Sequence, residues 1–203
     1  EQKLTIVVGE AELYETITIA EVIATPDDQL VTTKGIVLSS LVNKEGFYIV
    51  DATGVIAVQT TIDACKEVKP GDEVIIRGTK DHKVDEGVSC AGQINIFQAE
   101  VLANNYGEHE IPSHLYDRTK DLNDLYNLDP TEDHTTELYV VKGIIEFSYM
   151  QHYSSVLIKS EDGKSVLNLY TSSADQYSWL KEYAGQVIEF EVTVCNWNNK
   201  NYY

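Results

Sequence analysis

The sequence predicts an all-β protein with short helices, built from two tandem copies of one small β module. Two observations carry this prediction: β-branched runs separated by Gly, Asp and Asn turns, and an internal repeat. The repeat starts at Val31–Val37 and returns at Tyr139–Ile145, where Gly143 lies 108 positions after Gly35. Self-similarity at a nearly constant spacing indicates a repeated architecture. Three further segments match in the same order: Phe47–Gly54 with Val156–Gly163, Ile56–Thr60 with Leu167–Thr171, and Pro70–Val74 with Ala184–Val187.

The first module is predicted over residues 17–105. Thr18 suits the N-cap of one helical turn that ends before Pro26. A second helical turn is expected near Ile62–Val68, between the third and fourth strands. Five strands with a helix at this place follow the order of the OB-fold, a partly open five-stranded Greek-key barrel. The expected strands are Leu30–Leu41, Phe47–Asp51, Val55–Thr60, Glu73–Lys80 and Gln93–Leu102, with a polar loop over Asp81–Ala91.

The rest of the chain is divided into an N-terminal strand and linker (1–16), an acidic linker (106–136) and a second module (137–203). The linker should contain a short helix at Thr119–Tyr126. The second module repeats the first three strands. A helix over Ala174–Tyr183 follows, with Gly185 as its C-terminal cap, and then a fourth strand over Gln186–Asn196.

The second barrel is expected to be incomplete, because the sequence reaches Tyr203 where strand five should begin. The last six residues span roughly 20 Å when extended, which is about half a strand. An open strand edge invites pairing with another chain. We therefore expect the natural protein to continue past Tyr203, or the edge to be capped by Leu4–Val8 or by a neighbouring molecule.

The charge is strongly negative throughout. The 203 residues carry a formal net charge of −18, and each half contributes −9: 17 acidic and 8 basic residues in 1–105, 16 and 7 in 106–203. Such a field repels nucleic acid at long range unless a local basic patch intervenes, and the chain has only two arginines, Arg77 and Arg118. No run of about 20 apolar residues predicts a membrane span.

The residues that usually carry chemistry form no known pattern. The five histidines are scattered, with no HxH or HExxH spacing, and no nucleophile–base or phosphate-loop motif occurs. The sequence therefore predicts no enzyme, no metal site and no cofactor. Cys65 and Cys90 could pair within the first module while Cys195 stands alone; buried free thiols are the favoured interpretation.

Residues Gly46–Val58 combine an aromatic-apolar strand, an Asp-Ala-Thr-Gly turn and an alternating strand. This stretch resembles the bacterial extracytoplasmic OB-fold domain family, and Val68–Gly78 is similar to that family's Gly-Asp entry into strand four. The resemblance covers residues 17–105 well and 131–203 loosely. It implies a non-catalytic binding or spacer module of a secreted or lipoprotein multidomain protein, with nucleic-acid binding as the family's inherited label. Lys3–Gly9 resembles the closing strand of a bacterial immunoglobulin-like domain.

OB-folds bind ligands across strands two and three, and strand alternation sorts the side chains that face outward there. Base stacking needs aromatic platforms and a basic groove; Tyr48 and Tyr170 could supply platforms, although packing is the commoner role of such tyrosines. The favoured function is a protein- or glycan-binding module, and the alternative is single-stranded nucleic-acid binding. The candidate ligand-binding residues are Tyr48, Gln59 and Lys34 in the first module, and Tyr170, Asn168, Lys159 and Lys142 in the second.

Overall fold

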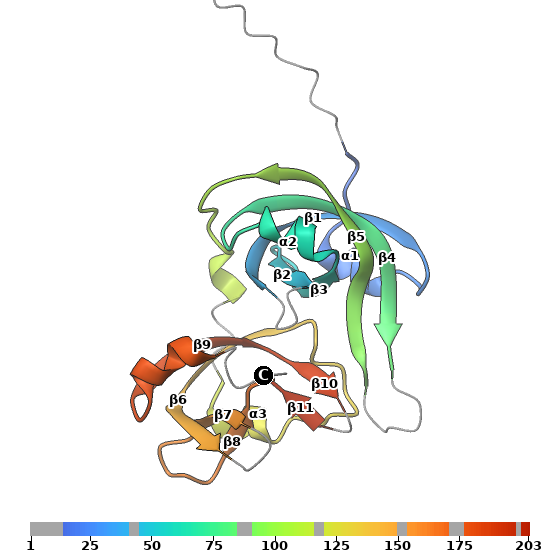
Figure 1. The fold of residues 1–203 in the computed structure, drawn as a ribbon. Coiled ribbons are helices and arrows are strands. Elements are labelled where there is room, and N and C mark those ends of the chain that lie inside the picture. Colours follow the sequence, from blue (N-terminus) through green and yellow to red (C-terminus); the bar gives the residue numbers. More distant parts are fainter. Residues whose placement is uncertain are drawn as a thin grey trace, which may run out of the picture.

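The computed structural model describes residues 14–40, 45–84, 91–115, 120–149, 154–170, 177–197 and 200–203. The described chain is mostly β and forms two main sheets (Figure 1). The first barrel contains α1 (Ile19–Ala24), β1 (Leu30–Ser40), β2 (Gly46–Val50), β3 (Val55–Gln59), α2 (Ile62–Lys66), β4 (Glu73–Lys83) and β5 (Gln93–Asn105). After η1 (Ser113–Leu115), the C-terminal unit contains α3 (Leu122–Tyr126), β6 (Leu138–Tyr149), β7 (Ser154–Lys159), β8 (Val166–Asn168), η2 (Ser178–Tyr183), β9 (Val187–Thr193), β10 (Cys195–Trp197) and β11 (Lys200–Tyr202).

The first barrel is closed, and its strand order is β1-β2-β3-β5-β4. All of its strand pairs are antiparallel except β3 with β5, where Ala57 pairs with Asn95 and Val58 with Ile96. This order, with α2 between β3 and β4, is the OB-fold order that the sequence predicts. The predicted boundaries of β1 to β3 are within about two residues of those observed, whereas β4 and β5 each extend three residues further.

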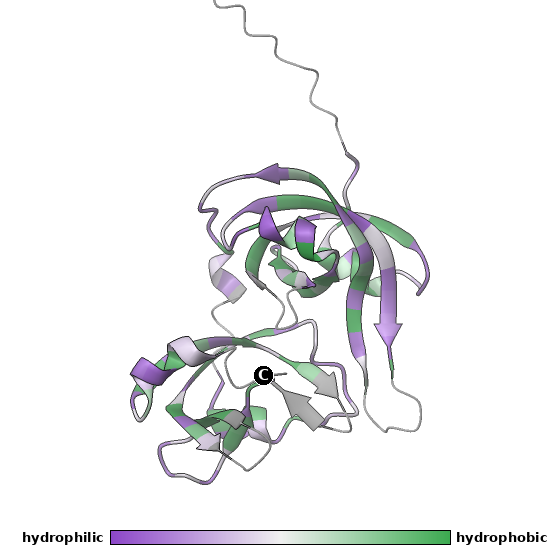
Figure 2. Cartoon of the chain, in the orientation of Figure 1, coloured by the Kyte–Doolittle hydropathy of each residue, from purple (hydrophilic) through white to green (hydrophobic). Residues whose placement is uncertain are grey.

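Alternation along the strands fills the barrel interior. Phe47 and Ile49 of β2 and Ile56 and Val58 of β3 all lie in one buried cluster, as predicted. Helix α1 closes this core by adding Ile19 and Val22, both fully buried. In Figure 2 hydrophobic stretches alternate with hydrophilic ones along the strands of the first barrel, and the arrowhead end of β4 is hydrophilic.

Helix α1 is held by its own cap and by the β2–β3 turn. The Thr18 side chain accepts a hydrogen bond from the Glu21 N–H, and the Glu21 carboxylate accepts one from the Thr18 N–H at 2.8 Å, which completes a capping box. From the turn, the Asp51 carboxylate accepts the Ile19 N–H at 2.8 Å and the Thr53 and Gly54 N–H groups at 2.7 and 3.1 Å. The Asp-Ala-Thr-Gly turn is therefore a structural connection between the sheet and the helix.

The sheet of the C-terminal unit, in the order β8-β7-β6-β9, repeats the pairing of β1 to β4. Gly35 of β1 pairs with Val74 of β4, and Gly143 of β6 pairs with Ile188 of β9. The predicted equivalence of the two glycines is confirmed. Both approach a neighbouring strand closely: a Cβ atom at Gly35 would lie 3.0 Å from the Val50 carbonyl oxygen, and one at Gly143 would lie 2.3 Å from Ile158 Cγ2.

Helix α3 belongs to the C-terminal core and is more than a linker helix. Its Leu122 and Leu125 are buried in the same cluster as Val141 and Ile158. The Asn123 side chain accepts a hydrogen bond from Ser165 in the turn after β7. Helix α3 therefore adds two buried side chains to the core of the second sheet, as α1 does in the first barrel. The repeat starts before residue 137.

The fourth and fifth strands of the C-terminal unit differ from the predicted single fourth strand followed by half of a fifth. The predicted fourth strand is divided into β9 and β10, and β10 pairs with β11 in a separate hairpin. The Tyr203 N–H donates to the Asn168 carbonyl at 3.0 Å, and the Tyr170 N–H donates to the Tyr203 carbonyl at 2.8 Å. This is a parallel contact, like that of β3 with β5. The predicted half of strand five is therefore present, and among the residues that the structure describes the second sheet does not close into a barrel.

The region before β9 also differs from the prediction. Of the helix expected over Ala174–Tyr183, the described part is the 3-10 helix η2, and residues 174–176 lie outside the described residues. Gly185 follows η2 with a φ of +79°, which fits its predicted capping position. The expectation for Leu4–Val8 also falls outside the described residues.

Candidate functional site

The outward face of β2 and β3 in the first barrel lies against the C-terminal unit. Val50 and Val55 are buried there together with Leu138, the first residue of β6. Ala57 is fully buried as well. Partly buried side chains complete this cluster; they are Ile36, Leu38, Tyr48 and Ile111. The face on which an OB-fold holds its ligand is here a contact within the chain.

Tyr48 points away from the barrel core, as predicted, but it is partly buried against the C-terminal unit instead of lying open to solvent. The side chains of Thr193, Gln93, Tyr177 and Cys195 lie close to its hydroxyl group. Burial raises the pKa of Tyr48 to about 12. The phenol ring therefore connects the first barrel to the end of β9, and its face is not a free stacking platform.

Polar groups at the same junction are also buried. Asn95 of β5 is 1% exposed, and its Oδ1 atom has no hydrogen-bond partner within the described residues. The thiol of Cys195 is partly buried, which raises its pKa to about 12. Gln59, at the end of β3, remains partly exposed. Of the three candidate ligand-binding residues in the first module, Tyr48 lies in this junction, whereas Gln59 and Lys34 lie outside it and contact solvent.

The segment before β6 completes the junction. The Thr136 carbonyl accepts the Val55 N–H at 3.3 Å, and the Thr135 hydroxyl accepts the Ile94 N–H at 3.2 Å. The Ala91 N–H donates to the Pro130 carbonyl at 2.8 Å. The last part of the predicted linker, residues 130–136, is thus joined to the first barrel by three hydrogen bonds.

The three candidate lysines are all engaged by glutamates. Lys34 pairs with Glu73 at 3.0 Å, and Lys142 pairs with Glu189 at 3.4 Å. Lys159 pairs with Glu146. The hydrogen bond from Lys34 lowers the pKa of Glu73, which keeps that carboxylate ionised near its lysine. The candidate residues therefore present no excess of positive charge.

The outward face of β7 and β8 in the C-terminal unit remains open to solvent. Asn168 is exposed, and Lys159 and Tyr170 are partly exposed. The Tyr170 backbone is held on two sides, because its carbonyl accepts the Tyr177 hydroxyl at 2.7 Å and its N–H donates to Tyr203. The structure brings these three candidates together on one surface, and Lys142 lies on the neighbouring strand β6.

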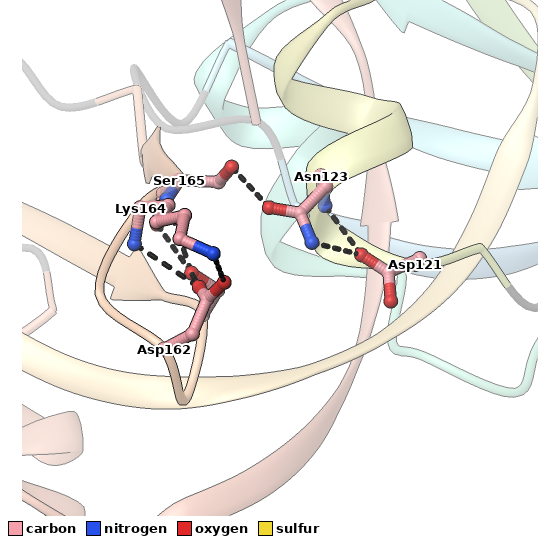
Figure 3. Close-up of polar contacts among 6 residues, drawn as sticks. Asp121, Asn123, Asp162, Lys164 and Ser165 are labelled. Atoms are coloured by element: carbon pink, nitrogen blue, oxygen red, sulfur yellow. Dashed lines mark hydrogen bonds and ion pairs between the residues drawn. The ribbon is translucent and has the colours of Figure 1, made fainter.

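A shallow cleft of about 520 Å³ lies beside α3 and the β7–β8 turn, and its polar lining is internally bonded. Figure 3 shows Asp162 accepting from the Lys164 side chain, and Asp121 accepting from Asn123. The hydrogen bond from Ser160 is the main cause that lowers the pKa of Asp162 to about 2. Apart from Lys142, none of the residues around this cleft was a predicted site residue. Its lining residues are Lys120, Asp121, Leu122, Asn123, Lys142, Ser160, Glu161 and Asp162.

The described histidines, cysteines and carboxylates form no metal site, and the described cysteines are free thiols. Among the described residues, no three His, Cys, Asp or Glu side chains are grouped so that they could hold a metal ion. Cys65 and Cys195 are free, partly buried thiols, whereas Cys90 lies outside the described residues. No helix in the described part of the chain is long and apolar enough to cross a membrane.

No protein-family model and no curated protein sequence matches this chain. Among solved structures, it is similar to the hypothetical protein ygiW from E. coli, with 23% identity over 44% of this chain and 91% of that chain, and a TM-score of 0.33. A murine DNA-binding protein bound to double-stranded DNA matches with 10% identity over 70% and 74%, at a TM-score of 0.40. A replication protein A heterotrimer bound to single-stranded DNA matches with 14% identity over 84% and 46%, at 0.41. Matches this distant say nothing about what this chain binds.

Proposed function

We propose that this protein is a non-catalytic interaction module of an extracytoplasmic bacterial protein, formed by two tandem OB-like units that act as one body. The observation that carries the proposal is the buried outward face of β2 and β3. Val55 is 1% exposed, because it packs with Leu138 and its N–H donates to the Thr136 carbonyl, and Ala57 on the same face is 0% exposed. The surface that serves ligand binding in an OB-fold joins the two units instead.

The ligand surface in this proposal is the outward face of β7 and β8. Asn168, Tyr170 and Lys159 offer an amide, a phenol and a cation that is already paired with a glutamate. Such a surface is polar, partly aromatic and nearly neutral. It suits a protein or glycan ligand, which is held by hydrogen bonds and aromatic contact, better than a polyanion.

Single-stranded nucleic-acid binding ranks second. That function needs a positive groove that follows the phosphates and aromatic platforms for the bases. Here the candidate lysines pair with glutamates, Tyr48 is partly buried at the junction, and the net charge is −18. The extracytoplasmic location in our proposal rests on the family resemblance of Gly46–Val58.

A pair of binding measurements tests the proposal. A fluorescent single-stranded oligonucleotide titrated at physiological salt should show no saturation at low micromolar protein. Glycan and peptide arrays should yield ligands whose binding is lost in the double variant Asn168→Ala, Tyr170→Ala. Gln59→Ala on the first barrel is the matched control and should bind normally. Tight, salt-sensitive oligonucleotide binding that Tyr170→Ala abolishes would overturn the proposal in favour of the nucleic-acid alternative.

A further inference from the structure

The outer face of the first barrel carries a row of exposed apolar side chains. Leu30 of β1 is 70% exposed, and Phe97 of β5 is 42% exposed. Thr79 of β4 lies between them, because it pairs with Leu30 on one side and with Phe97 on the other. Residues directly opposite each other in a sheet point to the same face, so these three side chains form one row, which we call the outer strip.

A β-bulge accompanies the exposure of Phe97. The register of β4 with β5 shifts just before Thr79, which leaves Gln98 as an extra residue on β5. Gln98 has a φ of +51°, which is unfavourable for a residue with a Cβ atom. Phe97 and Gln98 are both exposed, whereas Ala99 returns to the core. Bulges redirect side chains, and strained backbone gathers at functional positions, so this place on the barrel is a candidate contact surface.

The outer strip borders the junction of the two units. Asn95 and Phe97 lie two positions apart on β5 and therefore point to the same side of the strand. Asn95, at the junction, is 1% exposed, and the exposed fraction rises to 42% at Phe97. The covered part of this face thus ends between the two residues, and the outer strip is its open continuation.

Acidic side chains surround the outer strip. Asp81 and Glu100 follow it along β4 and β5, and Asp28 lies just before β1. The Asp28 N–H donates to the Lys80 carbonyl at 2.9 Å, which holds Asp28 beside β4. Arg77 shares the face of the strip and lies opposite Glu100 in the ladder. The three carboxylates outnumber this guanidinium, and residues 1–105 carry 17 acidic against 8 basic side chains, so the surroundings favour a positively charged partner.

We propose that the outer strip binds a cationic segment of a partner protein. The segment places an aliphatic or aromatic side chain on the strip and a lysine or arginine next to Asp81 or Glu100. Apolar area removed from water supplies affinity, and the opposite charges supply orientation and a faster encounter. The site belongs to the first barrel alone, so it does not depend on the ligand surface proposed on β7 and β8.

Two other occupants fit the outer strip less well. A nucleic acid would bring phosphates close to the carboxylates of Asp81 and Glu100, and like charges repel. A second copy of this chain would bring a net charge of −18 against a molecule with the same charge.

Fluorescence anisotropy at physiological salt, with a short labelled peptide that alternates lysine with leucine, tests the proposal. Residues 1–203 should bind this peptide saturably below about 1 mM, and higher salt should weaken the binding. The double variant Leu30→Ser, Phe97→Ser should raise the dissociation constant about tenfold or more. Ile62→Ser is the matched control, because Ile62 is a 49% exposed apolar residue of α2 outside the strip; it should leave the dissociation constant unchanged.

Several outcomes would overturn the inference. A dissociation constant that the double variant does not change would mean that the peptide binds elsewhere by charge alone. Equal binding of a peptide that alternates glutamate with leucine would remove the charge argument, and absence of saturation would exclude the site. A dimer in sedimentation velocity that the double variant dissociates would assign the strip to a second copy, and oligonucleotide binding that it abolishes would assign the strip to nucleic acid.

Discussion

Replacing Gly143 by alanine should destabilise the C-terminal unit strongly, because the added methyl group has no room. Its Cβ would lie 2.3 Å from Ile158 Cγ2, 2.8 Å from Leu122 Cδ1 and 2.9 Å from the Lys159 carbonyl oxygen. Ile158 is fully buried and Leu122 is almost so, and the third neighbour is backbone. Overpacking of this kind costs about 1 to 3 kcal/mol, and we expect Gly143→Ala to fall in the upper half of that range.

The repeat supplies a graded comparison. At Gly35 the nearest atoms would be 3.0 and 3.1 Å from the new Cβ, so Gly35→Ala should cost about 1 kcal/mol. At Gly54 the nearest atom would be 3.5 Å away, an ordinary contact, so Gly54→Ala should stay within about 0.5 kcal/mol of the parent.

Urea unfolding followed by tryptophan fluorescence is the suitable assay, because the two tryptophans, Trp179 and Trp197, both belong to the C-terminal unit. Circular dichroism reports both units and should follow Gly35→Ala. An unchanged fluorescence midpoint in Gly143→Ala would refute the packing argument. So would a loss in Gly54→Ala as large as the loss in Gly143→Ala.

Two further predictions concern the junction and the helix cap. Burial raises the pKa of Tyr48 and of Tyr177 to about 12, so the stability held by their neutral forms is complete below the ordinary tyrosine pKa of 10 and is lost as pH rises toward 12. Spectrophotometric titration should show tyrosines that ionise well above pH 10, and the Tyr48→Phe variant should have one such tyrosine fewer. Ionisation of every tyrosine near pH 10 would contradict the burial of these side chains at the junction. Asp51→Ala should lower the free energy of unfolding by about 1 to 3 kcal/mol, since it removes the acceptor of three backbone N–H groups. Asp63 is exposed, so the control variant Asp63→Ala should change the free energy of unfolding by less than about 0.5 kcal/mol. Equal thermal midpoints for the two aspartate variants would show that the Asp51 cap contributes nothing.

The strands of the first barrel could be predicted from the sequence because alternation and turn residues agree along them. In Phe47–Val50 and Val55–Val58 the inward residues were identified correctly, since a shift of one residue would have reversed both faces. The order of the strands could be predicted as well, because it follows from the OB-like succession of elements.

The burial of the candidate site could not be predicted from alternation alone, because alternation gives the direction of a side chain and not what covers it. Tyr48 does point outward, but the C-terminal unit lies there. A usable signal was present: Val55-Ile56-Ala57-Val58 is apolar without interruption, which is typical of a strand covered on both faces.

Two other differences have physical causes as well. Leu122 and Leu125 have the same spacing as Ile19 and Val22, so the helix predicted within the linker is part of the repeat. Strand β11, in contrast, carries no apolar alternation, and its place is determined by the Tyr203 hydrogen bonds to distant residues. Contacts of that kind are set by tertiary structure and leave no local pattern.

The packed junction also decides where this chain could be divided. A fragment that ends at Asn105 would keep every strand of the closed barrel, yet it would lose the cover of Leu138 and of the segment that precedes it. Val50, Val55, Ile36 and Leu38 would then form one contiguous apolar patch on its surface. Patches of this kind promote self-association, so we expect the isolated first barrel to aggregate although all of its strands are present. A fragment that stays monomeric must therefore include the segment that covers β2 and β3 as well as the repeated barrel.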